Sequence, residues 1–220
     1  MIFVVVPAFN EGKKIGRVIR DLFEHGYRQV VVVDDGSSDD TFRQAQIAGA
    51  LVLRHKINRG QGAALQTGNE QALRLGATII VHFDADGQFN PKDITGAINK
   101  INSDNVDVVL GSRFLGKRSQ IPFFKLFFIL PISRLINNLL TGLKLSDVHN
   151  GFRVLNQHAA RKIQITQDGM AHNSQIPKLI KEYQLNYAEY PVEVFYEENG
   201  QGIAAGFKIL YDLLIAKINQ

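Results

Sequence analysis

The sequence predicts an α/β fold in which helices cover both faces of a mostly parallel sheet. Short apolar runs, the predicted strands, alternate with longer segments whose apolar residues have helical spacing. Such alternation implies parallel strands joined by right-handed crossovers. The first two runs are almost wholly apolar, which is typical of strands buried on both faces. Polar and glycine-containing loops follow the strands, so we expect a ligand site at the carboxyl edge of the sheet.

The first half of the chain contains four predicted strands, at residues 2–6, 30–33, 51–53 and 78–83. A helix is expected after each of the first three strands, at residues 15–23, 41–48 and 63–75. Gly49 and Gly76 follow the last two of these helices, and glycine commonly ends a helix.

The second half continues with a predicted helix after Pro91, a strand at residues 106–110, short strands at 187–190 and 192–196, and a final amphipathic helix at 207–218. Residues 121–145 form the most apolar segment. Its phenylalanines fall on one helical face, the apolar residues after Pro131 fall on another, and basic residues are interspersed. Two interpretations stay open for it: a pair of interfacial helices on a membrane surface, or a helix facing the core or a second copy of the chain.

Composition sets further limits. The 220 residues suit one large domain or two small ones, and 45% apolar with 21% charged residues is ordinary for a globular protein. The net charge of +4 permits an anionic ligand or membrane surface but does not indicate nucleic acid. There is no cysteine, which agrees with a reducing compartment. No apolar run approaches the ~20 residues of a membrane span, and the start does not look like a signal peptide. We therefore expect a cytoplasmic protein.

Asp84 and Asp86 follow the fourth predicted strand, one residue apart, with Gln88 close behind. Two carboxylates at the end of a buried strand need a counter-charge. Their oxygen atoms and the amide oxygen of Gln88 are hard ligands that suit Mg²⁺ or Mn²⁺. The alternative is an ordinary Asp-Gly turn before a helix that starts near Pro91.

Three more loops of unusual composition follow the other early strands, so four loops should meet at one edge of the sheet. We expect Asp35 to accept hydrogen bonds from a nucleobase and Glu11 to accept them from a ribose. Gly60 and Gly62 would let the backbone approach a ligand. Each has a simpler interpretation as a helix cap or turn residue, but their convergence favours a binding site. The chain has neither the dinucleotide-binding glycine fingerprint nor the P-loop motif.

These loops resemble the nucleotide-sugar half of family 2 glycosyltransferases, and of the dolichyl-phosphate mannosyltransferase branch in particular. The matching motifs are Pro7-Ala8 with Asn10-Glu11, Asp34-Asp35-Gly36-Ser37, Asn58 with Gly60 and Gly62, and Asp84-Ala85-Asp86 with Gln88. The resemblance implies a GT-A fold with a Rossmann-like sheet, a UDP- or GDP-sugar donor, a divalent metal, and inversion at the anomeric carbon.

The resemblance continues on the acceptor side, through Gly111-Ser112-Arg113, Asp147 to Arg153, and residues 170–176. It implies one glycosyltransferase domain over residues 1–220, with a donor half at 1–113 and an acceptor half at 114–220. Arg113, Arg134 and Arg153 would bind an acceptor phosphate, because the guanidinium fork suits phosphate oxygens. Asp147 is a candidate base or a structural residue. Gln175 and Asn199 depart from the family, which usually has an acid and a basic residue there.

The sequence thus predicts a metal-dependent inverting glycosyltransferase whose acceptor is a polyprenyl phosphate or a related membrane-borne molecule. We expect it to lie on the inner face of a membrane as a peripheral protein, with a homo-oligomer left open. The alternatives are a transferase that uses a saccharide hydroxyl in cell-surface polysaccharide synthesis, and a non-catalytic nucleotide-sugar binding protein.

Overall fold

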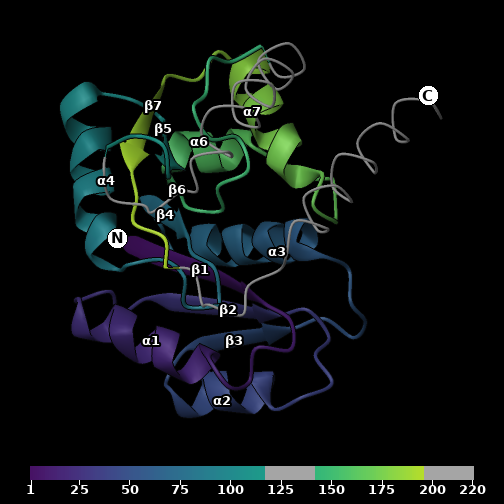
Figure 1. The fold of residues 1–220 in the computed structure, drawn as a ribbon. Helices are drawn as coiled ribbons and strands as arrows, with labels where there is room; N and C mark the ends of the chain where they lie inside the picture. Colours follow the sequence, from purple (N-terminus) through teal and green to yellow (C-terminus); the bar gives the residue numbers. More distant parts are fainter. Residues whose placement is uncertain (117–141, 196–220) are drawn as a thin grey trace, which may run out of the picture.

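A seven-stranded sheet runs through the protein in the order β3-β2-β1-β4-β6-β5-β7 (Figure 1). The computed structural model describes residues 1–116 and 142–195. The strands are β1 (Ile2–Ala8), β2 (Val30–Asp34), β3 (Leu51–Arg54), β4 (Ile79–His82), β5 (Val108–Ser112), β6 (Arg153–Asn156) and β7 (Tyr187–Pro191). The predicted α/β class is confirmed.

Six strands of the sheet run parallel, and β6 runs against its two neighbours. β1 pairs with β2 and β4, and β5 pairs with β7, all in parallel. β6 lies antiparallel between β4 and β5, with Val154 opposite both Val81 and Val109. One strand of the predicted acceptor half therefore joins the last strand of the donor half to the rest of the sheet.

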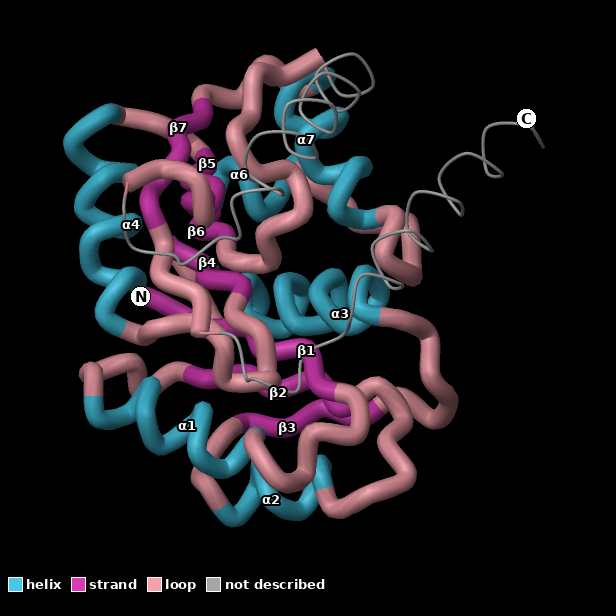
Figure 2. Tube along the Cα trace, viewed as in Figure 1, coloured by secondary structure: helices cyan, strands magenta, loops and turns pink. Residues whose placement is uncertain are grey.

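Helices cover both faces of the sheet, as predicted (Figure 2). One face carries α1 (Ile15–Glu24), α2 (Thr41–Ile47) and α4 (Lys92–Asp104). The other carries α3 (Gln61–Arg74), α6 (Gln157–Lys162) and α7 (His172–Glu182). Side chains of a strand alternate between faces, so in β1 Val4 and Val6 pack on the first face, and Phe3 and Val5 on the second.

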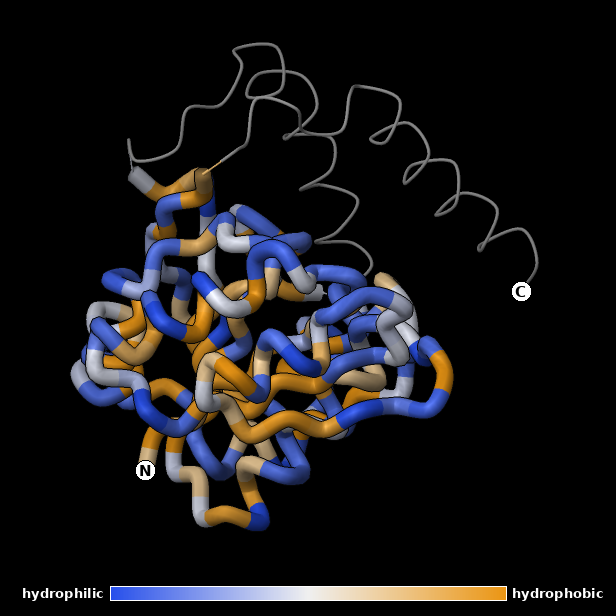
Figure 3. The backbone as a smooth tube through the Cα atoms, turned by 90° about the horizontal axis from the view of Figure 1, so that it is seen from below, coloured by the Kyte–Doolittle hydropathy of each residue, from blue (hydrophilic) through white to orange (hydrophobic). Residues whose placement is uncertain are grey.

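The apolar strands form the centre of the molecule, and hydrophilic segments lie mostly around them (Figure 3). Below the carboxyl end of β4, Phe83, Phe89 and Phe152 pack edge to face, with ring centroids 5.7 to 6.4 Å apart. Aromatic pairs favour this arrangement. The cluster anchors the loop that carries the paired carboxylates to the loop that precedes β6.

The predicted strands of the first half and the strands at 106–110 and 187–190 are confirmed, with ends displaced by one or two residues. The strand predicted at 192–196 is wrong for its described part, where Val194 only bridges to Phe89. β6 was not predicted. Most of the 121–145 segment and the helix at 207–218 lie outside the described residues. Within residues 1–116 and 142–195, no helix is long and apolar enough to cross a bilayer.

Candidate active site

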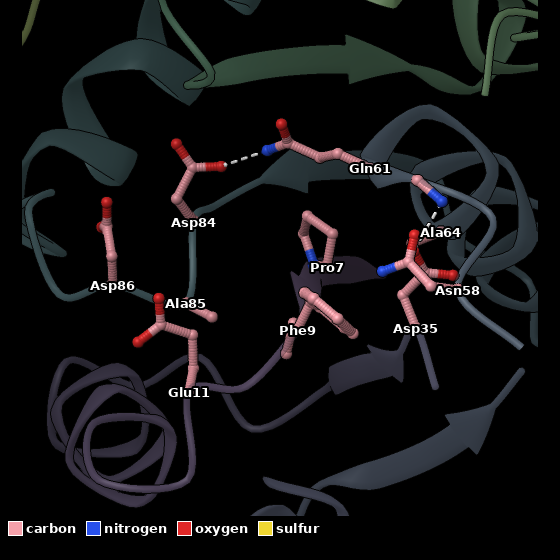
Figure 4. Close-up of a pocket in the computed structure, with 12 residues that line it drawn as sticks. Pro7, Phe9, Glu11, Asp35, Asn58, Gln61, Ala64, Asp84, Ala85 and Asp86 are labelled. Atoms are coloured by element: carbon pink, nitrogen blue, oxygen red, sulfur yellow. Dashed lines mark hydrogen bonds between the residues drawn. The ribbon is translucent and has the colours of Figure 1, made fainter. Parts of the chain in front are cut away.

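A pocket of about 370 Å³ opens at the carboxyl ends of the first four strands. The loops that follow all four of them contribute to its wall, which confirms their predicted convergence. The lining residues are Pro7, Ala8, Phe9, Glu11, Asp35, Asn58, Gly60, Gln61, Ala64, Asp84, Ala85 and Asp86. In Figure 4, Asp84 and Asp86 lie towards one end, and Asp35 and Asn58 lie towards the other, with Pro7 and Phe9 between them.

Asp35 follows β2 and is held by the loop after β3. Its Oδ1 atom accepts hydrogen bonds from His55 Nδ1, at 2.6 Å, and from the Arg59 amide, at 2.9 Å. Its Oδ2 atom accepts from the Gly60 amide at 2.6 Å. The neighbouring Asp34 is turned away from the pocket, where it pairs with Arg54 at 3.0 Å. Of these two acids, Asp35 is therefore the one that lines the pocket.

The loop after β1 is fixed to the loop after β2 by Asn10, which has a left-handed backbone with φ 56°. The Asn10 amide donates to Ser37 Oγ, and its side-chain oxygen accepts from the Ser38 amide. Asn10 therefore shapes the loop without lining the pocket. Glu11 does line it, and its carbonyl accepts from the first amides of the α1 segment. In Figure 4, Glu11 lies nearer to Asp86 and Ala85 than to Asp35.

Gly60 and Gly62 were expected to let the backbone approach a ligand. In the structure, the segment that packs closely on them belongs to the protein itself. A side chain at either position would overlap the backbone of residues 167–168. The amide of Gly62 donates to the Asp168 carbonyl at 2.7 Å, at the start of α3. Gly60 has φ 100° and also lines the pocket, whereas Gly62 does not. These glycines thus let a loop of the second half rest on the amino end of α3.

Asp84 and Asp86 form the acidic end of the pocket. Asp84 Oδ1 accepts from Gln61 Nε2 at 2.9 Å, and Asp86 Oδ1 accepts from the Gln88 amide at 3.0 Å (Figure 4 shows the first bond). Burial, and next the charge of Asp86, raise the pKa of Asp84 to about 7, although Arg153 and Gln61 oppose this shift. The pair thus has an excess of negative charge that a cation would relieve.

The residues fit a hard divalent ion that takes part of its coordination from a ligand. Two carboxylates face a pocket with room for a diphosphate. Within the described residues, no cluster of three or more His, Cys, Asp or Glu side chains exists to enclose a metal by itself. Gln88 is not among the lining residues, and its backbone amide orients Asp86.

Arg153 lies in the interior beneath the acidic end, with only 1% of its surface exposed. Its Nη2 atom donates to Asn173 Oδ1 at 2.5 Å. Burial lowers its pKa to about 10, and the charges of Asp84 and Asp147 counteract that shift. The guanidinium remains charged at neutral pH and acts as an internal counter-charge. It does not line the pocket.

Arg113, at the end of β5, is clamped by Asp147. The Nε and Nη2 atoms of Arg113 donate to Oδ2 and Oδ1 of Asp147 at 2.7 and 2.8 Å, and its amide donates to Oδ2 at 3.1 Å. The Asn150 side chain donates a fourth bond to this carboxylate, to Oδ2 at 3.3 Å. Asp147 is 6% exposed, so its environment is that of a structural partner. Arg134 lies outside the described residues.

His172, at the start of α7, is fully buried and contacts backbone. Its Nδ1 atom donates to the Gly169 carbonyl at 2.8 Å. Burial, and then the charge of Arg153, lower its pKa to about 4. The ring is therefore neutral at pH 7, as expected for a structural histidine.

Gln175 replaces an expected acid with an amide that fixes the loop before α7. Its Oε1 atom accepts from the amides of Thr166 and Gln167, at 3.1 and 3.0 Å. Its Nε2 atom donates to Thr166 Oγ1 at 2.7 Å. No ionic group is needed for these bonds. Asn199 lies outside the described residues.

Several pocket residues were not predicted from the sequence. Gln61, Phe9 and Ala64 line the pocket beside Asn58, which belongs to a matched motif, and His55 supports Asp35 from behind. All except Ala64 fall in or beside the four loops, so their position after strands was a usable signal. Nothing local in the sequence pointed to Asn173, the partner of Arg153.

The profile described as "Glycosyl transferase family 2" matches residues 3–164. The chain belongs to this glycosyltransferase family. It is 38% identical to an uncharacterised protein of Methanocaldococcus jannaschii, over 99% of this chain and 92% of that one. It is 31% identical to the UDP-N-acetylglucosamine–dolichyl-phosphate N-acetylglucosaminyltransferase of Methanococcus voltae, over 100% and 97% of the two chains.

A third relative, the polyprenol monophosphomannose synthase of Mycolicibacterium smegmatis, is 27% identical over 74% of this chain and 64% of its own. Among solved structures, the glucosyl-3-phosphoglycerate synthase of Mycobacterium tuberculosis, in complex with Mn²⁺, UDP and glucosyl-3-phosphoglycerate, has a TM-score of 0.69. That likeness, at 19% identity, covers 94% of this chain and 75% of the synthase. The chain has the GT-A fold and is a glycosyltransferase.

Proposed function

We propose that this glycosyltransferase moves a sugar, with inversion, from a nucleotide-diphosphate sugar to a polyprenyl phosphate and requires Mg²⁺ or Mn²⁺. The observation that carries the proposal is the pocket formed by the four loops, with Asp35 at one end and the acidic pair Asp84 and Asp86 at the other. The names of two relatives, which specify dolichyl-phosphate and polyprenol products, support the acceptor class.

The donor would lie along the pocket. Asp35 would accept a hydrogen bond from the base, and Glu11 would accept from a hydroxyl of the ribose or the sugar. Asp84 and Asp86 would hold the divalent ion, and Gln88 would assist by orienting Asp86 through its backbone amide. Pro7, Ala8 and Ala85 would line the donor between the two ends of the pocket. The chemistry that such an ion supplies is neutralisation of charge on the departing diphosphate. The buried charge of Arg153 would favour the ionised form of Asp84.

In the transfer step, an oxygen of the acceptor phosphate forms a bond to the anomeric carbon. The bond from that carbon to the β-phosphate oxygen breaks, and the nucleoside diphosphate leaves with the electron pair. Attack from the opposite face inverts the configuration. A phosphate monoester, with a second pKa of ~6, is already ionised at neutral pH and needs no strong base. This agrees with the engagement of Asp147 by Arg113.

Arg113 would position the acceptor phosphate. The ion pair with Asp147 would fix the orientation of its guanidinium group. We assign Arg134 the same task on sequence grounds. Arg153 would act from the interior, through Asp84, because its side chain is buried.

The decisive experiment is a donor panel with matched acceptors. Purified protein with Mn²⁺ and UDP- or GDP-sugars is mixed with a short polyprenyl phosphate or with the corresponding free polyprenol. We expect release of nucleoside diphosphate only with the phosphate, loss of activity with chelator, and an inverted anomeric centre by NMR. Equal release with the free alcohol, or none with any donor, contradicts the proposal.

Because its acceptor would be lipid-borne, we also propose that the protein binds the inner membrane surface from the cytoplasm. Flotation of the protein with anionic vesicles that contain polyprenyl phosphate is the expected result. A protein that stays at the bottom of the gradient with these vesicles contradicts peripheral binding.

A further inference from the structure

We infer that the base end of the pocket selects a uracil ring over guanine and that His55 sets this selectivity through Asp35. The inference rests on the proposed function, to which it adds the donor nucleotide. Its basis is the number of hydrogen bonds that Asp35 already accepts. Asp35 lines the pocket, yet only 2% of its surface is exposed, so little of its carboxylate is open to a ligand.

An ionised carboxylate has about four lone-pair sites, two on each oxygen. His55 Nδ1 and the Arg59 amide occupy both sites of Oδ1, at 2.6 and 2.9 Å. The Gly60 amide occupies one site of Oδ2, at 2.6 Å. Among the described residues, these are the donors to the Asp35 carboxylate, so one acceptor site, on Oδ2, remains for a ligand.

The nucleobases differ in what they present to such a site. Guanine has two adjacent donors, N1–H and the 2-amino group, which pair with a carboxylate through both of its oxygens. Uracil has a single N3–H between two carbonyl oxygens. Cytosine has a lone pair at N3 instead of a hydrogen. One open acceptor site therefore matches uracil, leaves a guanine donor unpaired, and opposes the cytosine lone pair. An unpaired buried donor carries a penalty.

Asn58 supplies the complement to a uracil carbonyl. Its side chain lies beside Asp35 at the same end of the pocket (Figure 4). In the part of the chain that the structure describes, no hydrogen bond of the Asn58 amide group is formed. Its N–H can thus donate to the carbonyl next to the N3–H that Asp35 accepts.

His55 is held in place, so the number of hydrogen bonds that the Asp35 carboxylate accepts does not vary. Its second nitrogen, Nε2, contacts Thr67 Oγ1 at 3.0 Å, so the ring is held at both ends between the loop and α3. The His55 side chain is only 9% exposed. A residue that offers no donor here would free a site on Oδ1 and give guanine its second partner.

The test is calorimetric titration of the whole protein, in Mn²⁺, with UDP, GDP and CDP. We expect UDP to bind about tenfold or more tightly than the other two, the worth of one hydrogen bond to a charged group. His55→Leu should tighten GDP binding relative to UDP and so lower the ratio of the GDP to the UDP dissociation constant. His55→Asn, which keeps an N–H near the Nδ1 position, should retain it.

Thr67→Val is the matched control, because it removes the contact to Nε2 and leaves the Asp35 donors in place. It should keep the selectivity. GDP binding as tight as UDP in wild type, or an unchanged ratio in a folded His55→Leu protein, overturns the inference and leaves the proposed function standing. If none of the three nucleotides binds, the proposed function fails as well.

Discussion

Arg113 and Asp147 lie 34 positions apart in the chain and form a two-point ion pair, with N–O distances of 2.7 and 2.8 Å. The carboxylate also accepts the Arg113 amide and the Asn150 side chain. A carboxylate with these partners is already engaged, so removing its charge should affect the orientation of Arg113 before it affects any proton transfer.

We therefore expect Asp147→Asn to raise the Michaelis constant for the acceptor and to lower turnover at saturating acceptor by less than about tenfold. Arg113→Ala should raise the same constant more strongly and leave donor binding intact. Steady-state kinetics with varied acceptor measures both. A fall in turnover of about 10²–10⁴-fold in folded Asp147→Asn would instead identify a general base.

Asp84 would link the proposed metal binding to pH. Its pKa in the metal-free fold is about 7, above the ordinary value of 3.8. The folded state thus holds this proton more tightly than the unfolded state. Protonated Asp84 favours the fold below about pH 4, and this contribution is lost as the pH rises to about 7. A divalent ion bound at the proposed site would compete with the proton for the same oxygens.

Mn²⁺ should consequently raise the melting temperature more at about pH 8 than at about pH 5.5. Asp84→Asn should lose that increment and should melt higher than metal-free wild type at about pH 8. Differential scanning fluorimetry at both pH values measures this. Equal Mn²⁺ shifts in wild type and variant would contradict the assignment of Asp84 as a ligand.

Gly151 packs directly on the Asp84 carboxylate. A Cβ atom there would overlap Oδ2 and lie 2.9 Å from Oδ1. Gly151→Ala should displace the carboxylate and weaken Mn²⁺ binding by about tenfold or more, the effect expected when a supporting contact of a metal ligand is lost. Binding of uridine, which has no phosphate, should change little if the uracil assignment is correct.

Gly169→Ala is the control for this substitution, because a Cβ at Gly169 has no neighbour within 4 Å. Titration of each variant with Mn²⁺ gives the comparison. Unchanged metal affinity in Gly151→Ala would mean that Asp84 has room to move.

Gln175 stabilises the loop whose Asp168 carbonyl rests on the start of α3. Gln175→Glu keeps an acceptor for the amides of Thr166 and Gln167, so we expect the free energy of unfolding to change by less than about 0.5 kcal/mol. Gln175→Ala removes three bonds at an exposed site and should cost roughly 0.5–1.5 kcal/mol. Urea denaturation measures both, and equal midpoints for Ala and Glu would rule out this role.

The carboxyl-edge loops were predictable because parallel strands place their ends at one edge whatever their loops contain. Asp35, Glu11, Asp84 and Asp86 meet in one pocket for that reason. The roles of Gly60 and Gly62 were less visible, because the loop that packs on them lies about a hundred residues later. The residues around a glycine in the sequence do not show whether a ligand or another part of the protein packs against it.

β6 escaped prediction because, unlike the equally short strands β3 and β4, it begins with a charged residue. An arginine at 1% exposure contradicts the usual expectation for a central strand. Its burial depends on Asn173 and on the nearby carboxylates, all distant in sequence. The pairing of Arg113 with Asp147 was hidden for the same reason, and the sequence left Asp147 as either a base or a structural residue.

The antiparallel strand β6 also limits how this enzyme can be recombined. It is hydrogen-bonded to β4, which leads to the acidic pair, and to β5, which leads to Arg113. A chimera joined at residue 113 would therefore replace a strand in the middle of the sheet as well as the proposed acceptor region. Segment exchanges between relatives should therefore move β6 together with the edges of β4 and β5 that face it. The two parts of the chain can be exchanged only as a whole.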